Sequence, residues 1–169
     1  TYPLPEAQLD RFMFEIVIEH LSEEEEMEVV RSTTGILKPE FSHAVTGPDL
    51  LAFQELVRRV PVSESVLRYA VNLVRASRPS ANGDSPDFVK KWIAYGASVR
   101  AAQYLVLGSK AKALTQGRYH VSFDDIKSLA HPVLRHRILT NFHAESEGRT
   151  TGEIIDRLLE HVPVPTSGM

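Results

Sequence analysis

The chain has 169 residues, of which 43% are hydrophobic and 24% are charged, the balance of an ordinary globular protein with one main core. Its net charge of −3 gives no overall attraction to nucleic acid or to an anionic membrane surface. The absence of cysteine excludes disulfides, thiolate metal sites and cysteine nucleophiles, and it leads us to expect a cytoplasmic protein.

The first twenty residues combine a short helical phrase with an apolar run. We expect Glu6 to Phe12 to be helical and Met13 to Ile18, which is apolar and partly β-branched, to form a strand. A lone strand leaves its backbone hydrogen bonds unpaired, so this one must either pair with a segment outside the sequence or pack as an irregular edge, which again indicates a truncated sheet. Because the chain also begins at Thr1 rather than methionine, we expect a piece of a longer protein.

From residue 21 onward the pattern is helical. Four signals of the Ser/Thr-x-x-acid type, whose first side chain caps free amides, predict helix starts; they are Ser22 with Glu25, Thr46 with Asp49, Ser122 with Asp125, and Thr150 with Glu153. Apolar spacing predicts further helices at Glu64 to Ala76, Asp87 to Tyr95 and Ser98 to Thr115. Turn residues predict a surface loop at Arg78 to Pro86, and Pro163 to Met169 is expected to be a disordered tail. The fold class is therefore mainly α.

The sequence holds no complete machinery for nucleotide hydrolysis. A P-loop needs Gly-x4-Gly-Lys-Ser/Thr, so that backbone amides and a lysine hold the phosphates, and none of the nine glycines fits this pattern. Glu19 only faintly imitates the metal-binding acid after a Walker B strand, and we interpret it as a solvated residue. The seven histidines show neither His-Glu-x-x-His nor an i, i+4 pair, so we expect no metal site. The chain alone is thus not expected to be an ATPase.

The segment Tyr2 to Phe12 reads YPLPEAQLDRF. It resembles the segment after sensor 1 in MoxR-type AAA+ ATPases, where a near-identical string precedes the last core strand. The resemblance implies that Arg11 is a catalytic arginine finger, which acts in trans on the nucleotide of the neighbouring subunit. A planar, permanently charged guanidinium suits this role because it stabilises charge on a transferring phosphoryl group. The alternative is a structural arginine paired with Asp10 or Glu6.

The phrase Tyr95 to Ala101 reads YGASVRA and is similar to the family's sensor 2 motif, Gly-Ala-Ser-Pro-Arg-Ala, at the start of a lid helix. The resemblance implies that Arg100, with Ser98 and Ala97 beside it, binds nucleotide in cis. The first turn of a helix has free amides and a positive dipole that favour phosphate. Val99 replaces the family's proline, which makes the helix start less rigid. The alternative is a surface arginine beside an ordinary helix cap.

The phrase Ala130 to Arg137 reads AHPVLRHR and resembles the end of a later lid helix, so that the resemblance covers nearly the whole chain. Arg135 and Arg137, with His131 and His136, form a basic cluster suited to nucleotide, a neighbouring subunit or a substrate protein. A solvated helix end, where cations are favoured, is the interpretation that we prefer.

The resemblance implies two parts. Residues 1–20 would be a remnant of the α/β ATPase core, with the finger helix and the last strand, and residues 21–169 a helical AAA+ lid domain. The intact protein would bind ATP with Mg²⁺ between identical subunits of a ring, expected to be a hexamer, and drive chaperone-like remodelling or assembly of partner proteins. Such ATPases often act with von Willebrand factor A domain proteins. We expect no nucleotide on this chain alone and no membrane partner.

Three alternatives remain open. The chain could be a stand-alone helical interaction adaptor, which predicts a monomer that is indifferent to ATP. It could be the lid of a magnesium-chelatase-like AAA+ subunit, which would differ in its partner rather than its fold. A helical nucleic-acid binder using Arg135 to Arg137 would show salt-dependent affinity for DNA, but the acidic balance of the chain disfavours it.

Overall fold

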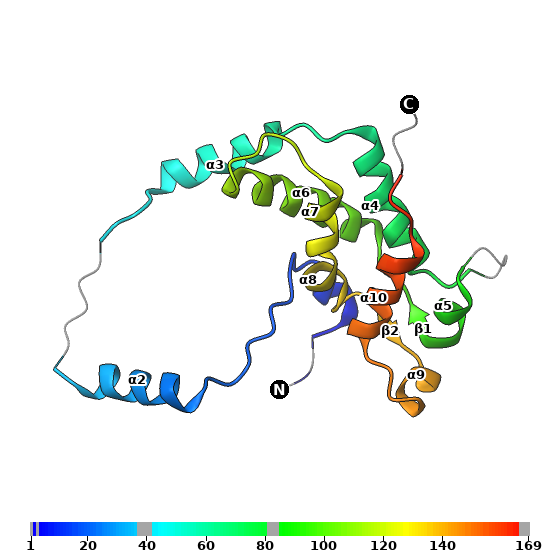
Figure 1. The fold of residues 1–169 in the computed structure, drawn as a ribbon, viewed down its shortest axis with the longest axis horizontal. Coiled ribbons are helices and arrows are strands. Elements are labelled where there is room, and N and C mark those ends of the chain that lie inside the picture. The colour runs from blue at the N-terminus through cyan, green and yellow to red at the C-terminus, as the bar shows by residue number, and fades with distance from the viewer. Residues whose placement is uncertain (1, 3, 37–41, 81–84, 166–169) are drawn as a thin grey trace.

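The computed structural model describes residues 2, 4–36, 42–80 and 85–165, and these residues are mainly helical (Figure 1). The helices are α1 (Glu6–Leu9), α2 (Glu23–Thr34), α3 (Gly47–Arg59), α4 (Glu64–Ala76), α5 (Asp87–Trp92), α6 (Val99–Thr115), α7 (Phe123–Ser128), α8 (Ala130–Leu134), α9 (Phe142–Ser146) and α10 (Thr151–His161). Two short strands, β1 (Ile93–Tyr95) and β2 (Leu139–Thr140), lie among the later helices. The predicted mainly α fold class is confirmed. The loop predicted at 78–86 and the tail predicted at 163–169 lie partly outside the described residues.

Local sequence signals set the helix starts. All four Ser/Thr-x-x-acid signals form capping boxes, in which the hydroxyl accepts from the amide three residues on and the acid accepts from the amide of the Ser or Thr. These boxes open α2, α3, α7 and α10. The bounds predicted for α4 are also confirmed, with Ser63 as its N-cap. A side chain that satisfies free amides is a short-range effect, which is why the sequence predicts it well.

The hydrophobic core is built around α6, which packs against α4, α7 and α8. The largest fully buried apolar side chains come from α4, α6, α7, α8 and α10; they are Tyr69, Leu73, Leu105, Ile126, Leu134, Ile154, Ile155 and Leu158. The ring of Tyr69 meets Phe123 edge-on at a centroid distance of 5.6 Å. Since burial of one such side chain is worth about 1.5–3 kcal/mol, this cluster is the main source of stability.

The segment Asp87 to Tyr95, predicted to be helical throughout, changes conformation after Trp92. Helix α5 ends there, and β1 pairs antiparallel with β2, placing Ile93 opposite Thr140. The Asn141 amide extends this connection by donating to the Trp92 carbonyl at 2.9 Å. A pairing partner far away in sequence therefore overrides the local helical pattern, which corrects the prediction.

The strand predicted at Met13 to Ile18 is not formed. Residues 13–22 are neither helix nor strand, and within the described ranges β1 and β2 pair only with each other. A strand requires a neighbour for its ladder hydrogen bonds, and this segment has none among those residues. Ile16 and Ile18 are left in solvent, 76% and 89% exposed, whereas Met13 and Phe14 lie beside Gly108 of α6.

Helices α2 and α3 lie at the margin of the fold. Helix α2 has no buried residue and lies apart from the helical core in Figure 1. Helix α3 also has none, but it lies along α6, where Lys110 Nζ donates to the Arg58 carbonyl at 3.0 Å. Like the other helices in the described part of the chain, both are too short or too polar to cross a membrane.

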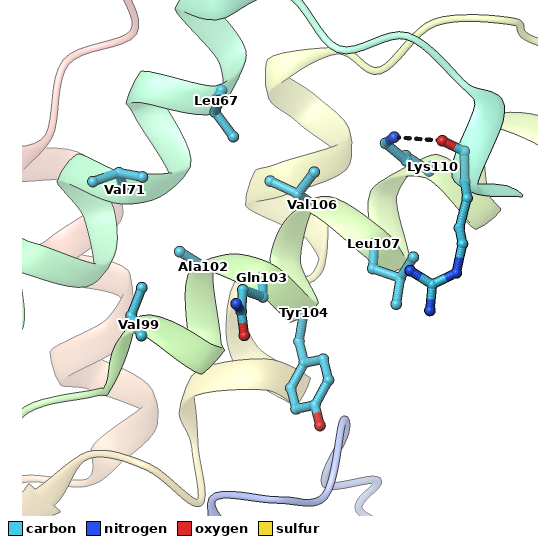
Figure 2. A pocket seen from close by; sticks show the side chains of 10 residues that line it. Leu67, Val71, Val99, Ala102, Gln103, Tyr104, Val106, Leu107 and Lys110 are labelled. Atoms are coloured by element: carbon cyan, nitrogen blue, oxygen red, sulfur yellow. Dashed lines mark hydrogen bonds between the residues drawn. The ribbon is translucent and has the colours of Figure 1, made fainter.

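An apolar groove of about 600 Å³ lies beside α6, and Figure 2 shows the side chains that line it. They are Arg58, Leu67, Val71, Val99, Ala102, Gln103, Tyr104, Val106, Leu107 and Lys110. The two cations are neighbours, since Lys110 donates to the Arg58 carbonyl, and none of the described residues that line the groove is an acid, a histidine or a serine. The groove therefore offers packing surface rather than a set of reactive groups.

Candidate functional site

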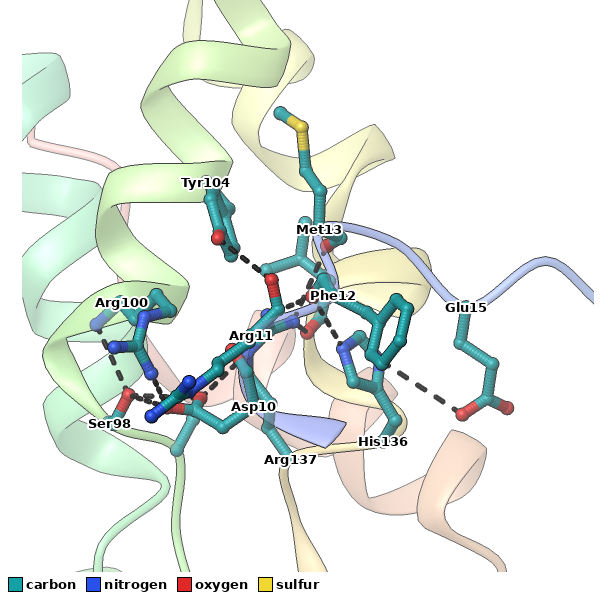
Figure 3. Close-up of polar contacts among 12 residues, drawn as sticks. Asp10, Arg11, Phe12, Met13, Glu15, Ser98, Arg100, Tyr104, His136 and Arg137 are labelled. Atoms are coloured by element: carbon teal, nitrogen blue, oxygen red, sulfur yellow. Dashed lines mark hydrogen bonds and ion pairs between the residues drawn. The ribbon is translucent and has the colours of Figure 1, made fainter. Parts of the chain in front are cut away.

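The carboxylate of Asp10, at the C-terminal end of α1, meets two of the predicted site residues (Figure 3). Ser98 Oγ lies 3.0 Å from each of its oxygens. Arg100 donates to Oδ2 at 2.5 Å, and Arg137 Nε donates to Oδ1 at 3.0 Å. One carboxylate thus joins the segment before Arg11 to the start of α6 and to the residues after α8.

Arg137 anchors this cluster from inside the protein, because its side chain is only 1% exposed. Besides Asp10, it donates to the carbonyls of Phe12, Met13 and Val133, and its guanidinium lies 5.1 Å from the centre of the Tyr104 ring. Burial lowers the pKa of Arg137, and the Asp10 carboxylate opposes that shift. A buried cation with this many acceptors has a structural role. The expectation that this residue lies at a solvated helix end is therefore wrong for Arg137.

Around Arg11, hydrogen bonds hold the main chain at three successive residues, Asp10, Arg11 and Phe12. Arg137 donates to the carbonyls of Asp10, at 2.9 Å, and of Phe12, and the Tyr104 hydroxyl donates to the Arg11 carbonyl at 3.0 Å. The Arg11 residue itself is exposed, and within the described residues its guanidinium has no hydrogen bond or ion pair. Asp10 is paired with other arginines instead, so the structural alternative in which Arg11 pairs with Asp10 is not what the structure adopts.

The loop before α6 is fixed against the end of α4. Ala97, which is buried, donates its amide to Ser77 Oγ at 3.0 Å, and its carbonyl accepts from Arg78 Nε at 2.8 Å. A Cβ on Gly96 would lie 2.3 Å from the Ser77 carbonyl oxygen, so only glycine permits this approach. The predicted site residues Ala97 and Ser98 are therefore held by contacts with α4 and α1.

Arg100 lies in the first turn of α6, as predicted. Ser98 caps the helix by accepting from the Arg100 amide at 3.2 Å, so helix α6 begins at Val99 without the proline of the resembling motif. The Arg100 side chain remains 40% exposed although it is paired with Asp10. A hollow of about 150 Å³ lies beside this pair, smaller than the usual ~300–1,000 Å³ of a small-molecule site.

His136 lies under the same segment. Its Nε2 is 3.0 Å from the Phe12 carbonyl, and its Nδ1 has no hydrogen-bond partner within the described ranges. Burial lowers the pKa of His136, the Phe12 carbonyl opposes that shift, and Arg137 adds to it. His131, another member of the predicted basic cluster, is separate and meets Asp156 at 2.8 Å.

Sequence reasoning brought Arg100, Ser98 and Ala97 to one place, but it missed Asp10 as the shared partner of Arg100 and Ser98. It also missed the role of Arg137. Asp10 and Arg137 are 127 positions apart, so no local spacing connects them. The sequence carried one hint: Asp10 and Arg137 lie in two segments that resemble the same family. That resemblance implies a shared fold but does not predict a contact between the two residues.

Comparisons with known proteins support the fold. A family model described as an AAA lid domain matches residues 86–158. Chaperone MoxR1 of Mycobacterium tuberculosis is 35% identical over 98% of this chain, and the YeaC protein of Bacillus subtilis is 31% identical over 98%. The crystal structure of a candidate ATPase from Cytophaga hutchinsonii matches with a TM-score of 0.89 at 38% identity over 98% of the chain.

The chain spans about half the length of the proteins it matches: 43% of MoxR1, 49% of YeaC and 50% of the crystallised chain. The likeness in sequence and in backbone extends over nearly every residue of the chain, beyond the part matched by the lid model. The chain therefore belongs to the MoxR family of AAA+ ATPases and corresponds to the C-terminal, lid-bearing part of such a protein.

Proposed function

We propose that this chain supplies two arginines to the ATPase cycle of a MoxR-type AAA+ protein: Arg11 as a finger in trans and Arg100 as a nucleotide sensor in cis. The observation that carries the proposal is the contrast at Arg11. Its main chain is tied down by Arg137 and Tyr104, while its guanidinium is exposed and unpaired within the described residues. A fixed backbone with a free cation is a suitable geometry for reaching an anion on another subunit.

The finger role fits the chemistry of phosphoryl transfer. The transition state spreads negative charge over the phosphoryl oxygens, and an added guanidinium is worth about 10³–10⁵ in rate where fingers have been tested. An arginine that is already neutralised by a buried carboxylate would supply less charge. Among the described residues Arg11 has no such partner, whereas Arg100 and Arg137 both share Asp10.

The sensor role of Arg100 rests on its place at the start of a long helix. Free amides and the helix dipole favour a phosphate there, and Ser98 and Ala97 complete the turn that faces it. The hollow of about 150 Å³ that Asp10 and Ser98 line is too small for a whole nucleotide, so the proposed site would have to be completed by other parts of the protein. The ATP, its Mg²⁺ and the residues that hold them would lie mainly outside this chain.

At the level of the whole protein, we propose a cytoplasmic ring, a hexamer of identical subunits, that uses ATP hydrolysis for chaperone-like remodelling. Support comes from the relative named Chaperone MoxR1 and from the trans role of Arg11, which requires a neighbouring subunit. Von Willebrand factor A domain proteins are the proposed partners, by the same family resemblance.

The test is complementation between two inactive variants of the intact protein. One carries Arg11→Ala, and the other lacks the phosphate-binding lysine of its P-loop. Mixed rings should recover hydrolysis that neither variant shows alone, because an intact Arg11 from one subunit then faces an intact P-loop of another. Arg31→Ala is the matched control, since this arginine lies on exposed α2 and pairs with Glu28 at 3.0 Å.

The outcomes separate the candidate functions. Activity that returns in the mixtures supports a finger in trans, and the Arg31→Ala variant should hydrolyse ATP like the wild type. Mixtures that stay inactive, beside an active wild type, rule out the trans role of Arg11. A wild type that neither binds nor hydrolyses ATP would favour the stand-alone interaction adaptor.

A further inference from the structure

We propose that Asp10 is a positioning residue that links the two arginines: it restrains Arg100, so that nucleotide binds less tightly, and it fixes the main chain from which Arg11 reaches the neighbouring subunit. This inference rests on the proposed function and assigns a role to a residue that makes no contact with nucleotide in that proposal. Its basis is the placement of one carboxylate between Arg100 and Arg137 (Figure 3).

The restraint on Arg100 follows from charge and geometry. Asp10 Oδ2 accepts from Arg100 at 2.5 Å, and Ser98 Oγ, 3.0 Å from both oxygens, holds the carboxylate in that position. A phosphate that approaches the exposed part of Arg100 meets a guanidinium that is already partly neutralised. It also meets the negative charge of Asp10 at close range, which repels it. Removing that charge should therefore strengthen anion binding at Arg100.

The positioning of Arg11 follows from the contacts that Asp10 makes with Arg137. Asp10 is tied to Arg137 twice, through Oδ1 at 3.0 Å and through its own carbonyl at 2.9 Å. Because Arg137 is buried and also reaches the Phe12 carbonyl, the backbone on each side of Arg11 is attached to one rigid group. Weakening the attachment at Asp10 should displace Arg11, and small displacements of a catalytic group slow reactions strongly.

The two effects have opposite signs, which separates them from simple damage to the fold. A residue with only a structural role would lower nucleotide affinity and turnover together, along with the melting temperature. A residue that restrains Arg100 and positions Arg11 should raise affinity and lower turnover. Arg137 keeps its carbonyl acceptors in the absence of the Asp10 charge, so the variant is expected to fold.

The experiment uses the intact protein with Asp10→Asn, a substitution that keeps the size of the side chain. Binding is measured with a fluorescent ATP analogue at equilibrium, and turnover by steady-state hydrolysis. We expect binding about two- to fivefold tighter, the range of a solvent-accessible charge pair, and kcat about ten- to hundredfold lower. Asp124→Asn is the matched control: it removes the same charge from an exposed residue outside the cluster, and both measurements should be unchanged.

A second variant tests separately the part of the proposal that concerns the positioning of Arg11. Tyr104→Phe removes the hydroxyl that donates to the Arg11 carbonyl and leaves Asp10 and Arg100 as they are. We expect a lower kcat with unchanged nucleotide affinity, and an unchanged kcat would overturn this part.

For Asp10→Asn, equal or weaker nucleotide binding overturns the restraint on Arg100, and failure to fold makes Asp10 a structural residue and overturns the proposal. If the wild type binds nucleotide but does not hydrolyse it, the proposed function fails, while the affinity comparison still decides whether Asp10 restrains Arg100.

Discussion

From α4 onward every helix carries at least one buried residue, whereas α1, α2 and α3 carry none. The later region forms its own core, which does not depend on the first fifty residues. The segment around Arg11 is attached where Asp10 and the carbonyls beside it meet Arg137, through hydrogen bonds and ion pairs, while α3 lies along α6. Because such contacts are individually weaker than a core, the position of Arg11 should be easier to change than the fold of the lid.

The largest effect should come from the core of the later region. Leu105→Ala on α6 removes a fully buried side chain and should lower the free energy of unfolding by about 2–5 kcal/mol. Leu51→Ala on α3, where the leucine is 64% exposed, should change it by less than about 0.5 kcal/mol. Urea denaturation of both variants measures the difference. Equal losses would contradict the division into a packed and an unpacked region.

The next largest effect on stability should come from an acid-sensitive ion pair in the packed region, between Asp125 and Arg118. Asp125 is 2% exposed and accepts from Arg118 at 2.5 and 2.8 Å. Burial alone would raise the pKa of Asp125, but hydrogen bonds from Arg118 and Ser122 outweigh it and lower the pKa to about 2, against 3.8 for an ordinary aspartate. This stabilisation is present above pH 4 and is lost as the pH falls toward 2, because the unfolded state takes up the proton first.

The loss amounts to about 2 kcal/mol over that window, from a shift of about two pKa units. Urea denaturation of the wild type and of Asp125→Asn at pH 5, 3 and 2 measures it. The gap in unfolding free energy between the two proteins should shrink as the pH falls. A gap that stays constant over this range would show that Asp125 carries no such linkage.

Asp125 and its capping partner Ser122 are an example of what can be predicted from the sequence, and other contacts show what cannot. The capping box of Ser122 and Asp125 was predictable because both groups lie within one helical turn. The partnership of Asp10 with Arg137 was not, because it depends on how two distant segments fold together. The prediction of a continuous helix across α5 and β1 failed for the same reason, since β2, the strand that pairs with β1, lies far along the chain. Helix starts therefore come from local chemistry, and the site comes from the tertiary fold.

A smaller effect is expected where the two regions join. Arg137→Gln removes the buried cation that holds the carbonyls of Asp10 and Phe12, so the segment around Arg11 should open more often. Trypsin cleavage after Arg11 should become at least about tenfold faster, the equivalent of losing one charge-assisted hydrogen bond. Cleavage after Arg31 on exposed α2 is the internal control and should not change. Unchanged cleavage at Arg11 would mean that Arg137 does not hold this segment.

The smallest effect concerns His136 in the same junction. Burial lowers the pKa of His136, the Phe12 carbonyl raises it in part, Arg137 lowers it further, and Glu15 and Asp10 raise it slightly. A histidine whose pKa is lowered in the folded state is protonated first in the open state. Stability is therefore present above its ordinary pKa of 6.5 and is lost as the pH falls below that value.

The local attachment of the segment should respond, because His136 Nε2 meets the main chain of residue 12. The Glu15 amide, which donates to the Pro132 carbonyl at 2.8 Å, reports that opening by hydrogen exchange corrected for its intrinsic pH dependence. Opening at pH 5.5 should exceed that at pH 7.5 by less than about tenfold, since pH 5.5 lies only about one unit below the ordinary pKa of histidine. His136→Gln retains an N–H donor without titrating, so its opening should be the same at both pH values. A wild-type protein with equal opening at both values would place the junction under the control of Asp10 and Arg137 alone.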